Sequence, residues 1–313
     1  MPKLIVSVPT YNRCELLDCF ISQHVKMLDE HEVSLYIFDN ASTDDTEAVV
    51  KKWMVDYALV KYIKHEKNMG PVYNVWSAMS TVEADYVWPI GDSMCISESC
   101  LKVALSKIDD GVDAIVYNLP GMNKTDEGFI TDKNNVLLKL RDVLSCLGTT
   151  VFSRKIIRKF DFKKFSFSWY PQTCCLLQGV ASTSFVLYWA KNNSVTSLIE
   201  AAKLKKGWYN SKNAIDIGIL NWVDTFMSLD YTEGIKKTGA INTWIFNWRR
   251  VLVMRSHGAI NLVMVLRNFK KIWLAAPKNT MGLPVMILSC IIPRQIVGLC
   301  IDIFRRAKNI DAH

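Results

Sequence analysis

Two aspartates follow apolar stretches of strand length in the first third of the chain. Asp39 ends the run "VSLYIFD" and Asp92 ends the run "YVWPIGD". Ser42, Thr43 and Asp44 could cap a following helix, so Asp39 is not needed as a cap. Its carboxylate can accept hydrogen bonds from a nucleobase imide or a ribose hydroxyl. These residue types therefore indicate a nucleotide-binding function for Asp39 and raise the question of what Asp92 does.

Two further polar clusters lie at comparable places. In "PTYNR" (9–13) a helix begins directly after a strand, where backbone amides and Arg13 could face phosphates, although a simple capped turn fits as well. In "NMGPVYN" (68–74), Asn68 and Asn74 flank the permissive Gly70 before another helix. Each cluster alone is weak evidence for a nucleotide-binding site, but the order and spacing of the clusters along the chain are strong evidence for one.

Alternating strands and helices must position these clusters. Strands are predicted at 3–10, 33–40, 60–66 and 86–92, and helices at 15–28, 42–57, 72–80 and 98–107. Such alternation predicts a parallel, Rossmann-like sheet covered by helices on both faces. Ligands of these sheets bind at the carboxyl ends of the strands. We therefore expect the four clusters to meet at one edge of the sheet.

The overall composition limits the class of protein. With 313 residues, half of them apolar and 22% charged, the chain is globular and forms one or two domains. Its nine cysteines include no CxxC pair, which favours reduced thiols over a disulfide or zinc site. The sequence enters an apolar strand directly after "MPK", so we expect no signal peptide.

Positive charge is concentrated in the last third of the chain. From Lys203 onward there are 17 Lys and Arg against 6 Asp and Glu, whereas the preceding part has 21 against 24. Apolar residues interleave with this charge, and Pro284, Pro293 and Arg294 interrupt the apolar run before it reaches the ~20 residues of a spanning helix. We expect helices that lie on an anionic membrane surface, with Arg305, Arg306 and Lys308 toward the headgroups. A buried helix with a basic end is the alternative, and nucleic-acid binding is disfavoured because no known binding module accompanies the charge.

At this point the sequence resembles a known family. Residues 38–46 resemble the "VDDGSTDGT" segment of family 2 GT-A-fold glycosyltransferases, and "VSVPTYNR" resembles their first strand. Asn-x-Gly-x-x-x-Asn at 68–74 and "DYVWPIGD" at 85–92 are most similar to the abequosyltransferase-like branch, and the resemblance covers about residues 3–105. It implies a GT-A, nucleotide-diphospho-sugar transferase fold. By this resemblance Asp39 binds the base, Thr10, Tyr11 and Arg13 bind the nucleotide, and Asp92 lies at the metal-diphosphate region.

The resemblance also sharpens the question about Asp92. Family enzymes usually place an Asp-x-Asp pair here to hold Mg²⁺ or Mn²⁺ against the donor diphosphate, but the aligned triplet is Asp92-Ser93-Met94. A thioether cannot replace a carboxylate as a ligand of a hard cation. Asp92 is therefore either a single, weak metal anchor or a hydrogen-bond acceptor for the donor sugar. In the second case Arg13 is the candidate for stabilising the leaving diphosphate.

No residue in the second half of the sequence stands out as the catalytic base. Six acids lie between Thr125 and Glu200, none in a recognisable Glu-Asp pair: Asp126, Glu127, Asp132, Asp142, Asp161 and Glu200. We assign the role to none of them. The segment "FSFSWYPQT" (165–173) could form a sugar-stacking wall or an ordinary core segment.

The sequence thus predicts a glycosyltransferase that moves a sugar from a nucleotide-sugar to a lipid-linked or surface-polysaccharide acceptor at the cytoplasmic face of the membrane. The alternative is a catalytically degenerate module that serves as a scaffold in polysaccharide assembly. We expect a donor-binding and catalytic domain at 1–202 and a basic helical region at 203–313. The predicted donor site comprises Pro9, Thr10, Tyr11, Arg13, Asp39, Asn40, Asn68, Gly70, Asn74, Gly91, Asp92 and Ser93, with Asp92 also the predicted metal ligand.

Overall fold

The computed structural model describes the backbone of residues 2–204 and 211–310, and the side chains of these residues except 202, 203 and 304–310. The chain forms two compact units, residues 1–205 and 206–313. Each unit is described by itself.

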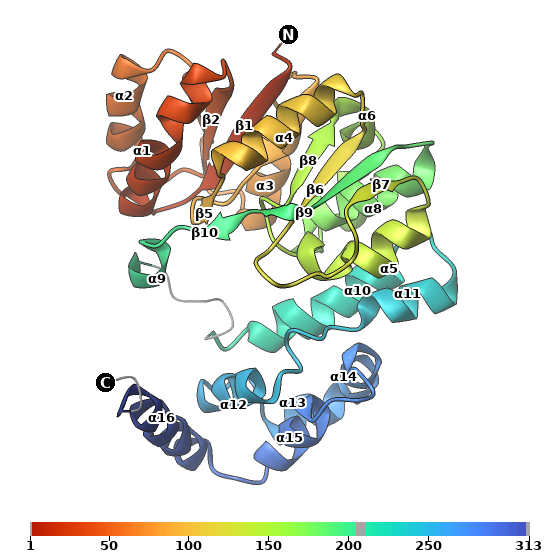
Figure 1. The fold of residues 1–313 in the computed structure, drawn as a ribbon. Coiled ribbons are helices and arrows are strands. Elements are labelled where there is room, and N and C mark those ends of the chain that lie inside the picture. Colours follow the sequence, from red (N-terminus) through yellow and green to blue (C-terminus); the bar gives the residue numbers. More distant parts are fainter. Residues whose placement is uncertain (1, 205–210, 311–313) are drawn as a thin grey trace. The chain divides into compact units, whose positions relative to one another are not determined.

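An eight-stranded sheet forms the centre of the first unit (Figure 1). Its strands, in spatial order, are β3 (Val60–Lys64), β2 (Ser34–Asp39), β1 (Leu4–Thr10), β4 (Tyr86–Pro89), β8 (Thr150–Ser153), β6 (Ala114–Asn118), β9 (Leu187–Ser194) and β7 (Gly128–Ile130). The first four are mutually parallel, as are β6 and β9, whereas β8 and β7 run antiparallel to their neighbours. The mostly parallel sheet predicted from the alternation of elements is therefore present.

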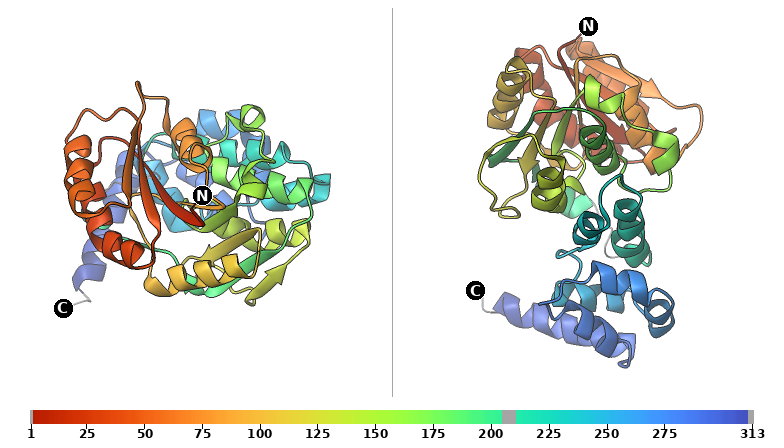
Figure 2. Two further views of the ribbon diagram at one scale, coloured as in Figure 1. Left: turned by 90° about the horizontal axis from the view of Figure 1, so that it is seen from above. Right: turned by 90° about the vertical axis from the view of Figure 1, so that its right-hand side faces the viewer.

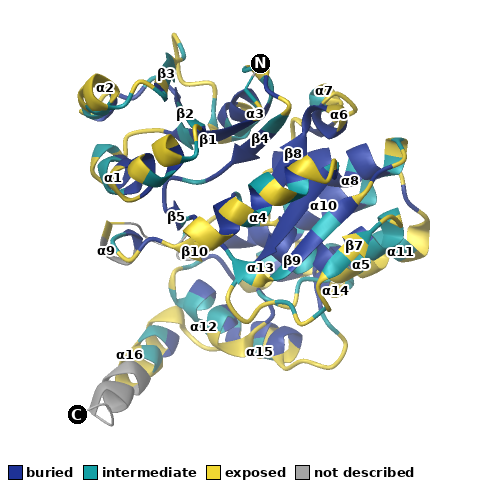
Figure 3. Ribbon diagram, turned by 45° about the horizontal axis from the view of Figure 1, so that its top comes forward, coloured by how far each residue is buried: buried dark blue, intermediate teal, exposed yellow. Residues whose placement is uncertain are grey.

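Helices cover both faces of this sheet (Figures 1 and 2). The helices of the unit are α1 (Cys14–Glu30), α2 (Thr46–Asp56), α3 (Pro71–Ser80), α4 (Glu98–Asp109), α5 (Lys133–Leu144), α6 (Arg154–Ile157), α7 (Phe162–Phe165), α8 (Pro171–Ser182) and α9 (Ala201–Leu204). Along α1, apolar residues recur at helical spacing and form one buried face. In Figure 3 the central strands β1, β4, β6 and β8 are almost wholly buried and the outer faces of the helices are exposed, as a three-layer fold requires.

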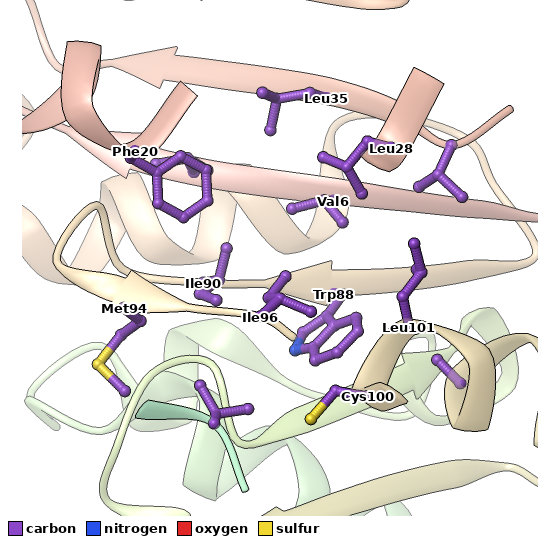
Figure 4. Packing of buried hydrophobic residues seen from close by; sticks show 14 of the residues in the cluster. Val6, Phe20, Leu28, Leu35, Trp88, Ile90, Met94, Ile96, Cys100 and Leu101 are labelled. Carbon is purple, nitrogen blue, oxygen red and sulfur yellow. The ribbon is translucent and has the colours of Figure 1, made fainter. Parts of the chain in front are cut away.

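Trp88 of β4 lies in the core between the sheet and α4 (Figure 4). Its ring stacks on Tyr117 with centroids 4.9 Å apart, and its Nε1 donates to the carbonyl of Gly148 at 2.7 Å. Figure 4 also shows Met94 in this cluster, near Ile90 and Ile96. The residues that follow β4 are thus anchored by apolar packing.

The fourth predicted strand, 86–92, is shorter in the structure. Strand β4 ends at Pro89, and a turn follows in which the Met94 amide donates to the carbonyl of Gly91 at 2.9 Å. The chain then forms the short strand β5 (Met94–Cys95), which pairs antiparallel with β10 (Thr196–Ser197). Asp92 therefore lies in a turn held on both sides by strands, three residues beyond the end of β4.

His24 of α1 is buried and fixes the segment that follows this turn. Its Nδ1 lies 2.7 Å from the carbonyl of Phe20, so it carries the proton, and its Nε2 accepts from the Ile96 amide at 2.9 Å. The ring also stacks on Phe20, with centroids 4.2 Å apart. Burial lowers the pKa of His24 below its ordinary value, although the bond to Phe20 partly opposes this. The neutral tautomer is therefore part of the folded structure.

We expect acid to destabilise the protein through His24. Because the folded-state pKa is lowered, the unfolded chain binds a proton below about pH 6.5 that the folded protein does not. The free energy of unfolding should then fall by about 1.4 kcal/mol per pH unit from this one group. Urea unfolding of wild type and His24→Gln between pH 5 and 8 measures how the free energy of unfolding changes with pH. The variant should lose the part of this pH dependence that comes from His24. Removal of the exposed His257 is the control, and an equal slope in wild type and His24→Gln would contradict the expectation.

The second unit is helical in its described residues. It contains the π-helix η2 (Asp216–Asn221), then α10 (Trp222–Met227), α11 (Glu233–Ala240), α12 (Trp248–Ser256), α13 (Leu262–Arg267), α14 (Phe269–Ala275), α15 (Gly282–Ser289) and α16 (Arg294–Ile310). Helix α12 packs against both α15 and α16. Arg255 of α12 donates to the carbonyls of Ser289, Ile260 and Ile292 at 2.9–3.1 Å and so fixes the connection between α15 and α16.

The two prolines predicted to interrupt the apolar run have different effects. Pro284 lies in the first turn of α15, where its missing amide hydrogen has no intrahelical acceptor in any case. Pro293 lies in the connection directly before α16 and separates the two helices. None of the helices in the described part of the chain is long and apolar enough to cross a membrane.

Candidate functional site

The carboxyl ends of the parallel strands bring the predicted clusters together, as their positions in the sequence indicated. Thr10 at the end of β1 is in register with Asp39 at the end of β2, and the Asn40 amide donates to the carbonyl of Thr10 at 3.0 Å. Because β4 is the other neighbour of β1, the turn with Asp92 reaches the same edge. The site is thus built on three adjacent strand ends.

Asp92 is bonded to the last residue of β1 and to a residue of the loop that follows it. Thr10 donates its hydroxyl to Oδ2 at 3.1 Å, and Arg13 Nη1 donates to Oδ1 at 2.9 Å. The Asp92 side chain is only 3% exposed, whereas that of Arg13 is 44% exposed. The structure therefore places Thr10, Arg13 and Asp92, all predicted from the sequence, in one contact, with both carboxylate oxygens engaged.

Met94 does not face this contact. It is 8% exposed and belongs to the apolar cluster around Trp88 (Figure 4). Ser93 is also buried, and its carbonyl accepts from the Leu198 amide at 2.9 Å. The turn thus presents a single carboxylate, and the position that would carry a second one in the resembling family belongs to the core.

The oxygen donors at Asp92 suit Mg²⁺ or Mn²⁺ chemically, but they are few. The carboxylate of Asp92 and the hydroxyl of Thr10 are hard ligands. Across residues 2–204 and 211–310, no group of three or more His, Cys, Asp or Glu side chains could hold a metal ion. A cation at Asp92 is therefore held only weakly by the protein alone, and the oxygens of a bound diphosphate would be needed to complete its coordination.

Both oxygens of Asp39 are also bonded within the protein. The Ser42 amide donates to Oδ1 at 2.9 Å, and the Tyr62 hydroxyl donates to Oδ2 at 2.5 Å. Burial, followed by the bond to Asp39, raises the pKa of Tyr62, so this hydroxyl keeps its proton. The carboxylate is fully buried, and its oxygens retain lone pairs for a further donor.

Sequence reasoning missed Tyr62. It could have been found from the register of β3 against β2. Asp39 pairs with Lys64, and Tyr62 lies two residues before Lys64 on the same face of the sheet. A polar-tipped aromatic there can reach a carboxylate at the end of the neighbouring strand.

Three predicted asparagines hold the loops of the site together. Asn74 donates its amide hydrogens to the carbonyls of Thr10 and Phe38 at 3.2 and 3.1 Å, and its Oδ1 lies 3.1 Å from Nε2 of His65. Asn40 donates to Asn68 Oδ1 at 2.9 Å and accepts from the amide of Met69 at 2.8 Å.

Asn68 Oδ1 also accepts from the amide of Gly70, whose φ of +83° suits glycine. The geometry gives these asparagines a structural function, in addition to any contact with a ligand.

The loops after β1 and β2 are bonded to each other. The Asn12 amide donates to Ser42 Oγ at 2.9 Å, and Asn12 Oδ1 accepts from the Thr43 amide at 2.8 Å. Asp44 accepts from the Cys14 amide at 3.0 Å and from Thr46, so one carboxylate serves the beginnings of both α1 and α2. Of the three predicted capping residues, Asp44 is the one that accepts from the first amide of α2. The first amide of α1, that of Cys14, also donates to Asp44.

Accessible side chains lie above this buried framework. Tyr11 is 40% exposed and Arg13 is exposed, whereas Thr10, Asp39, Asn40 and Asp92 are buried. Pro9 and Gly91 are partly buried. An incoming ligand can therefore contact an aromatic ring and a guanidinium group before it reaches the buried carboxylates.

The six acids considered as catalytic bases all have partners elsewhere in the first unit. Asp132 and Asp161 accept from amides at the beginnings of α5 and α7, and Glu127 accepts from Tyr188 and the Asn192 amide. Asp126 pairs with Lys191, Asp142 lies 3.9 Å from Arg141, and Gln23 donates to Glu200 at 3.3 Å. These contacts single out no base.

The aromatic segment 165–173 has both buried and exposed residues. Phe165 and Ser168 are fully buried, whereas Phe167 and Trp169 are 44% and 45% exposed. Phe165 and Phe167 stack with centroids 6.4 Å apart. The segment is therefore anchored in the core while two of its aromatic rings reach the surface.

Comparison with known proteins assigns the family. Residues 5–176, more than half of the chain, match Glycosyl transferase family 2, and the chain belongs to this family. The chain is 32% identical to abequosyltransferase RfbV of Salmonella typhimurium over 111 residues, which are 34% of this chain and 32% of that protein. It is 29% identical to the GalNAc(5)-diNAcBac-PP-undecaprenol beta-1,3-glucosyltransferase of Campylobacter jejuni over 119 residues, 38% of each chain. The chain thus matches about a third of the length of these relatives.

Solved structures share the fold over a greater length. The mannosyltransferase PcManGT from Pyrobaculum calidifontis, in complex with GDP-Man and Mn²⁺, superposes with a TM-score of 0.58 at 15% identity, covering 93% of this chain and 85% of that one. S. aureus TarS 1-349 in complex with UDP-GlcNAc gives a TM-score of 0.54 at 15% identity, covering 97% and 92%. These similarities confirm the GT-A-like α/β fold.

Proposed function

We propose that this protein is a glycosyltransferase that moves one sugar from a nucleotide-sugar to a saccharide acceptor that is lipid-linked or part of a surface polysaccharide. The observation that carries the proposal is the convergence of Asp39, Tyr11, Arg13 and Asp92 at three adjacent strand ends of a family 2 chain. The acceptor class is supported by the undecaprenol-linked saccharide in the name of one relative and by the abequosyltransferase activity of the other.

We assign each residue a function from its place at the strand ends, its hydrogen-bond partners and its charge. Asp39, held by Tyr62 and Ser42, accepts a hydrogen bond from the nucleobase or the ribose, while the exposed ring of Tyr11 stacks on the base. Arg13 faces the diphosphate and stabilises the charge that develops as the nucleoside diphosphate leaves. In the free protein Asp92 holds Arg13 and Thr10 in place. With the nucleotide bound, Asp92 and the phosphate oxygens would together hold a divalent cation. Such a cation, when bound, neutralises negative charge on the leaving group.

A binding module without catalysis is the second candidate function. Met94 favours it, because the turn after β4 carries one carboxylate where the resembling family has two. Both candidate functions require nucleotide binding at this site, but only the transferase breaks the bond between the sugar and the nucleotide. Isothermal titration with UDP, GDP, CDP and dTDP tests the site, and donor hydrolysis with each matching nucleotide-sugar tests catalysis. Binding without hydrolysis would favour the scaffold, and no binding across the panel would contradict both.

We expect Tyr11→Ala to weaken nucleotide binding substantially. Loss of the stacking surface should cost about 1–3 kcal/mol, or roughly 5- to 150-fold in the dissociation constant. Tyr11→Phe keeps the ring and is the matched control, which should bind within about a factor of three of wild type. Equal affinities of wild type and Tyr11→Ala in calorimetric titrations would remove Tyr11 from the base-binding surface.

We further propose that the unit of residues 206–313 binds an anionic membrane surface at the cytoplasmic face, where a lipid-linked acceptor is available. Thirteen large apolar side chains of α13–α16 and their connections are exposed: Leu262, Val263, Leu266, Phe269, Trp273, Met281, Ile287, Leu288, Ile291, Ile292, Ile296, Leu299 and Ile303. On α16, Ile296, Leu299 and Ile303 share one face. Exposed cations accompany them, including Arg267, Lys270 and Arg294. The side chains of Arg305, Arg306 and Lys308, also predicted to face headgroups, lie outside the described residues.

Substitution of exposed side chains tests this contact better than truncation does. Leu283 and Met286 of α15 are buried, and a Cβ on Gly282 would overlap the backbone of Phe246, so removing α15 would open the core of the unit. The double variant Leu288→Glu/Leu299→Glu changes only exposed positions.

We expect this variant to lose at least about 3 kcal/mol of membrane binding, since each of the two leucines contributes about 1.5–3 kcal/mol when buried in the acyl region. Sedimentation with phosphatidylglycerol vesicles measures the change, which is roughly a hundredfold in the partition coefficient. The double variant Met54→Glu/Val55→Glu replaces exposed apolar residues of α2 and is the control. Wild-type sedimentation of the leucine variant would place any membrane contact elsewhere in the protein.

A further inference from the structure

The contact between Arg13 and Asp92 closes the turn after β4 to cations. Arg13 Nη1 lies 2.9 Å from Oδ1 of Asp92, and the Thr10 hydroxyl lies 3.1 Å from Oδ2. A divalent cation could use only the lone pairs that these two donors leave on the carboxylate, and there it would be repelled by the guanidinium charge of Arg13. In the protein as it stands, Asp92 is therefore poorly available as a metal ligand.

The two side chains of this ion pair differ in exposure. Asp92 is buried in a turn between β4 and β5, and its side chain is 3% exposed. The Arg13 backbone is fixed as well, because its carbonyl accepts from the Leu17 amide of α1 at 2.9 Å. Its side chain, however, is 44% exposed and can change rotamer without disturbing the core. Any opening of the pair must therefore come from Arg13.

A diphosphate is the ligand that can cause this opening. Arg13 is an exposed cation at the edge of the sheet where the donor is proposed to bind, and a diphosphate offers more negative charge and more acceptor oxygens than one carboxylate does. When Arg13 turns to the diphosphate, Oδ1 of Asp92 becomes free. At that moment the phosphate oxygens that a cation needs are also in place.

We infer that Arg13 is a positioning residue that blocks Asp92 in the free protein and releases it when a nucleoside diphosphate binds. Divalent metal and donor then bind together, and the single carboxylate of this turn suffices. The second half of this inference, the release of Asp92 on nucleotide binding, rests on the proposed function. Its first half, the block in the free protein, depends only on the observed contacts.

The nucleotide-free protein tests the block directly. Electron paramagnetic resonance of MnCl₂ titrated into the full chain measures the dissociation constant of Mn²⁺ in wild type and in Arg13→Gln. We expect the variant to bind Mn²⁺ at least about tenfold more tightly than wild type. Arg13→Gln/Asp92→Asn should lose this gain, because the carboxylate is gone. Arg158→Gln, which removes another exposed arginine beside a carboxylate, Glu83 at 3.5 Å, is the matched control and should not change Mn²⁺ binding.

The change in Mn²⁺ affinity on nucleotide binding is measured with UDP and with GDP. The Mn²⁺ that the same concentration of nucleotide binds in buffer without protein is subtracted. In wild type the nucleotide that binds should raise Mn²⁺ affinity at least about tenfold, and in Arg13→Gln the rise should be smaller because the block is already absent. Equal Mn²⁺ affinities of nucleotide-free wild type and Arg13→Gln, both with intact melting curves, would overturn the inference. If neither UDP nor GDP binds, the proposed function fails for these donors, and the nucleotide-free comparison still decides the role of Arg13.

Discussion

Asp92→Asn will lower the rate of sugar transfer by about 10²–10³-fold and change the affinity for the nucleoside diphosphate much less. Asparagine keeps the shape of the side chain, but it removes the charge that holds Arg13 at 2.9 Å and places an amide where Oδ1 or Oδ2 now accepts. The Asp92 carboxylate matters most as charge develops on the leaving diphosphate, because it would help to hold the divalent cation there, so the loss should appear in kcat. Single-turnover transfer and calorimetric titration of the matching nucleoside diphosphate separate the two effects.

A matched control for this variant is Asp110→Asn. Asp110 also forms an ion pair, with Lys107 at 2.6 Å, but it lies at the end of α4 and its side chain is 48% exposed. Its replacement should leave transfer unchanged. If Asp92→Asn keeps wild-type turnover, Asp92 is a turn residue that fixes the loop after β1, and the catalytic interpretation of this turn is wrong.

Much of the donor half could be predicted because its signals are local. Three of the four strands are short apolar runs and each helix has its own period, so the alternation of elements predicts a parallel sheet. The rule that ligands bind at the carboxyl ends of strands then predicts that Thr10, Asp39 and Asp92 lie at one edge. The structure places them there because β1 lies between β2 and β4.

The remaining features depend on contacts between distant segments. The sequence around Met94 does not reveal that it faces the core, because the strand that directs it pairs with Thr196–Ser197, a hundred residues later. Antiparallel β8, inserted between β4 and β6, likewise follows from tertiary packing and has no local signal. Tyr62 was missed because its partnership with Asp39 requires the register of β3 against β2.

The asparagines show a different limit of sequence reasoning. Asn40, Asn68 and Asn74 were predicted to contact the donor because polar residues at strand ends are typical of binding sites. In the structure their amides bridge strand ends and hold the loop before α3. A side chain with two donors and an acceptor can serve either purpose, and only its neighbours decide between them.

Asp39→Ala will both weaken nucleotide binding and destabilise the fold. The substitution leaves the Ser42 amide and the Tyr62 hydroxyl without their acceptor at a buried position, which should lower the free energy of unfolding by about 2–4 kcal/mol. Loss of the hydrogen bond from the base should cost a further 1.5–3 kcal/mol of nucleotide affinity, as is usual for a bond to a charged group, roughly 10- to 150-fold. Urea unfolding and calorimetric titration measure the two losses separately.

Tyr62→Phe separates the two functions of Asp39. It removes only the bond to Oδ2, so it should cost about 1–2 kcal/mol of stability while the carboxylate, still held by Ser42, continues to accept from the base. Nucleotide affinity of this variant should therefore stay within about threefold of wild type, at a stability between those of wild type and Asp39→Ala. An Asp39→Ala protein that is destabilised but binds nucleotide as tightly as wild type would show that Asp39 only fixes the end of β2. The base would then have to be bound by exposed residues such as Tyr11.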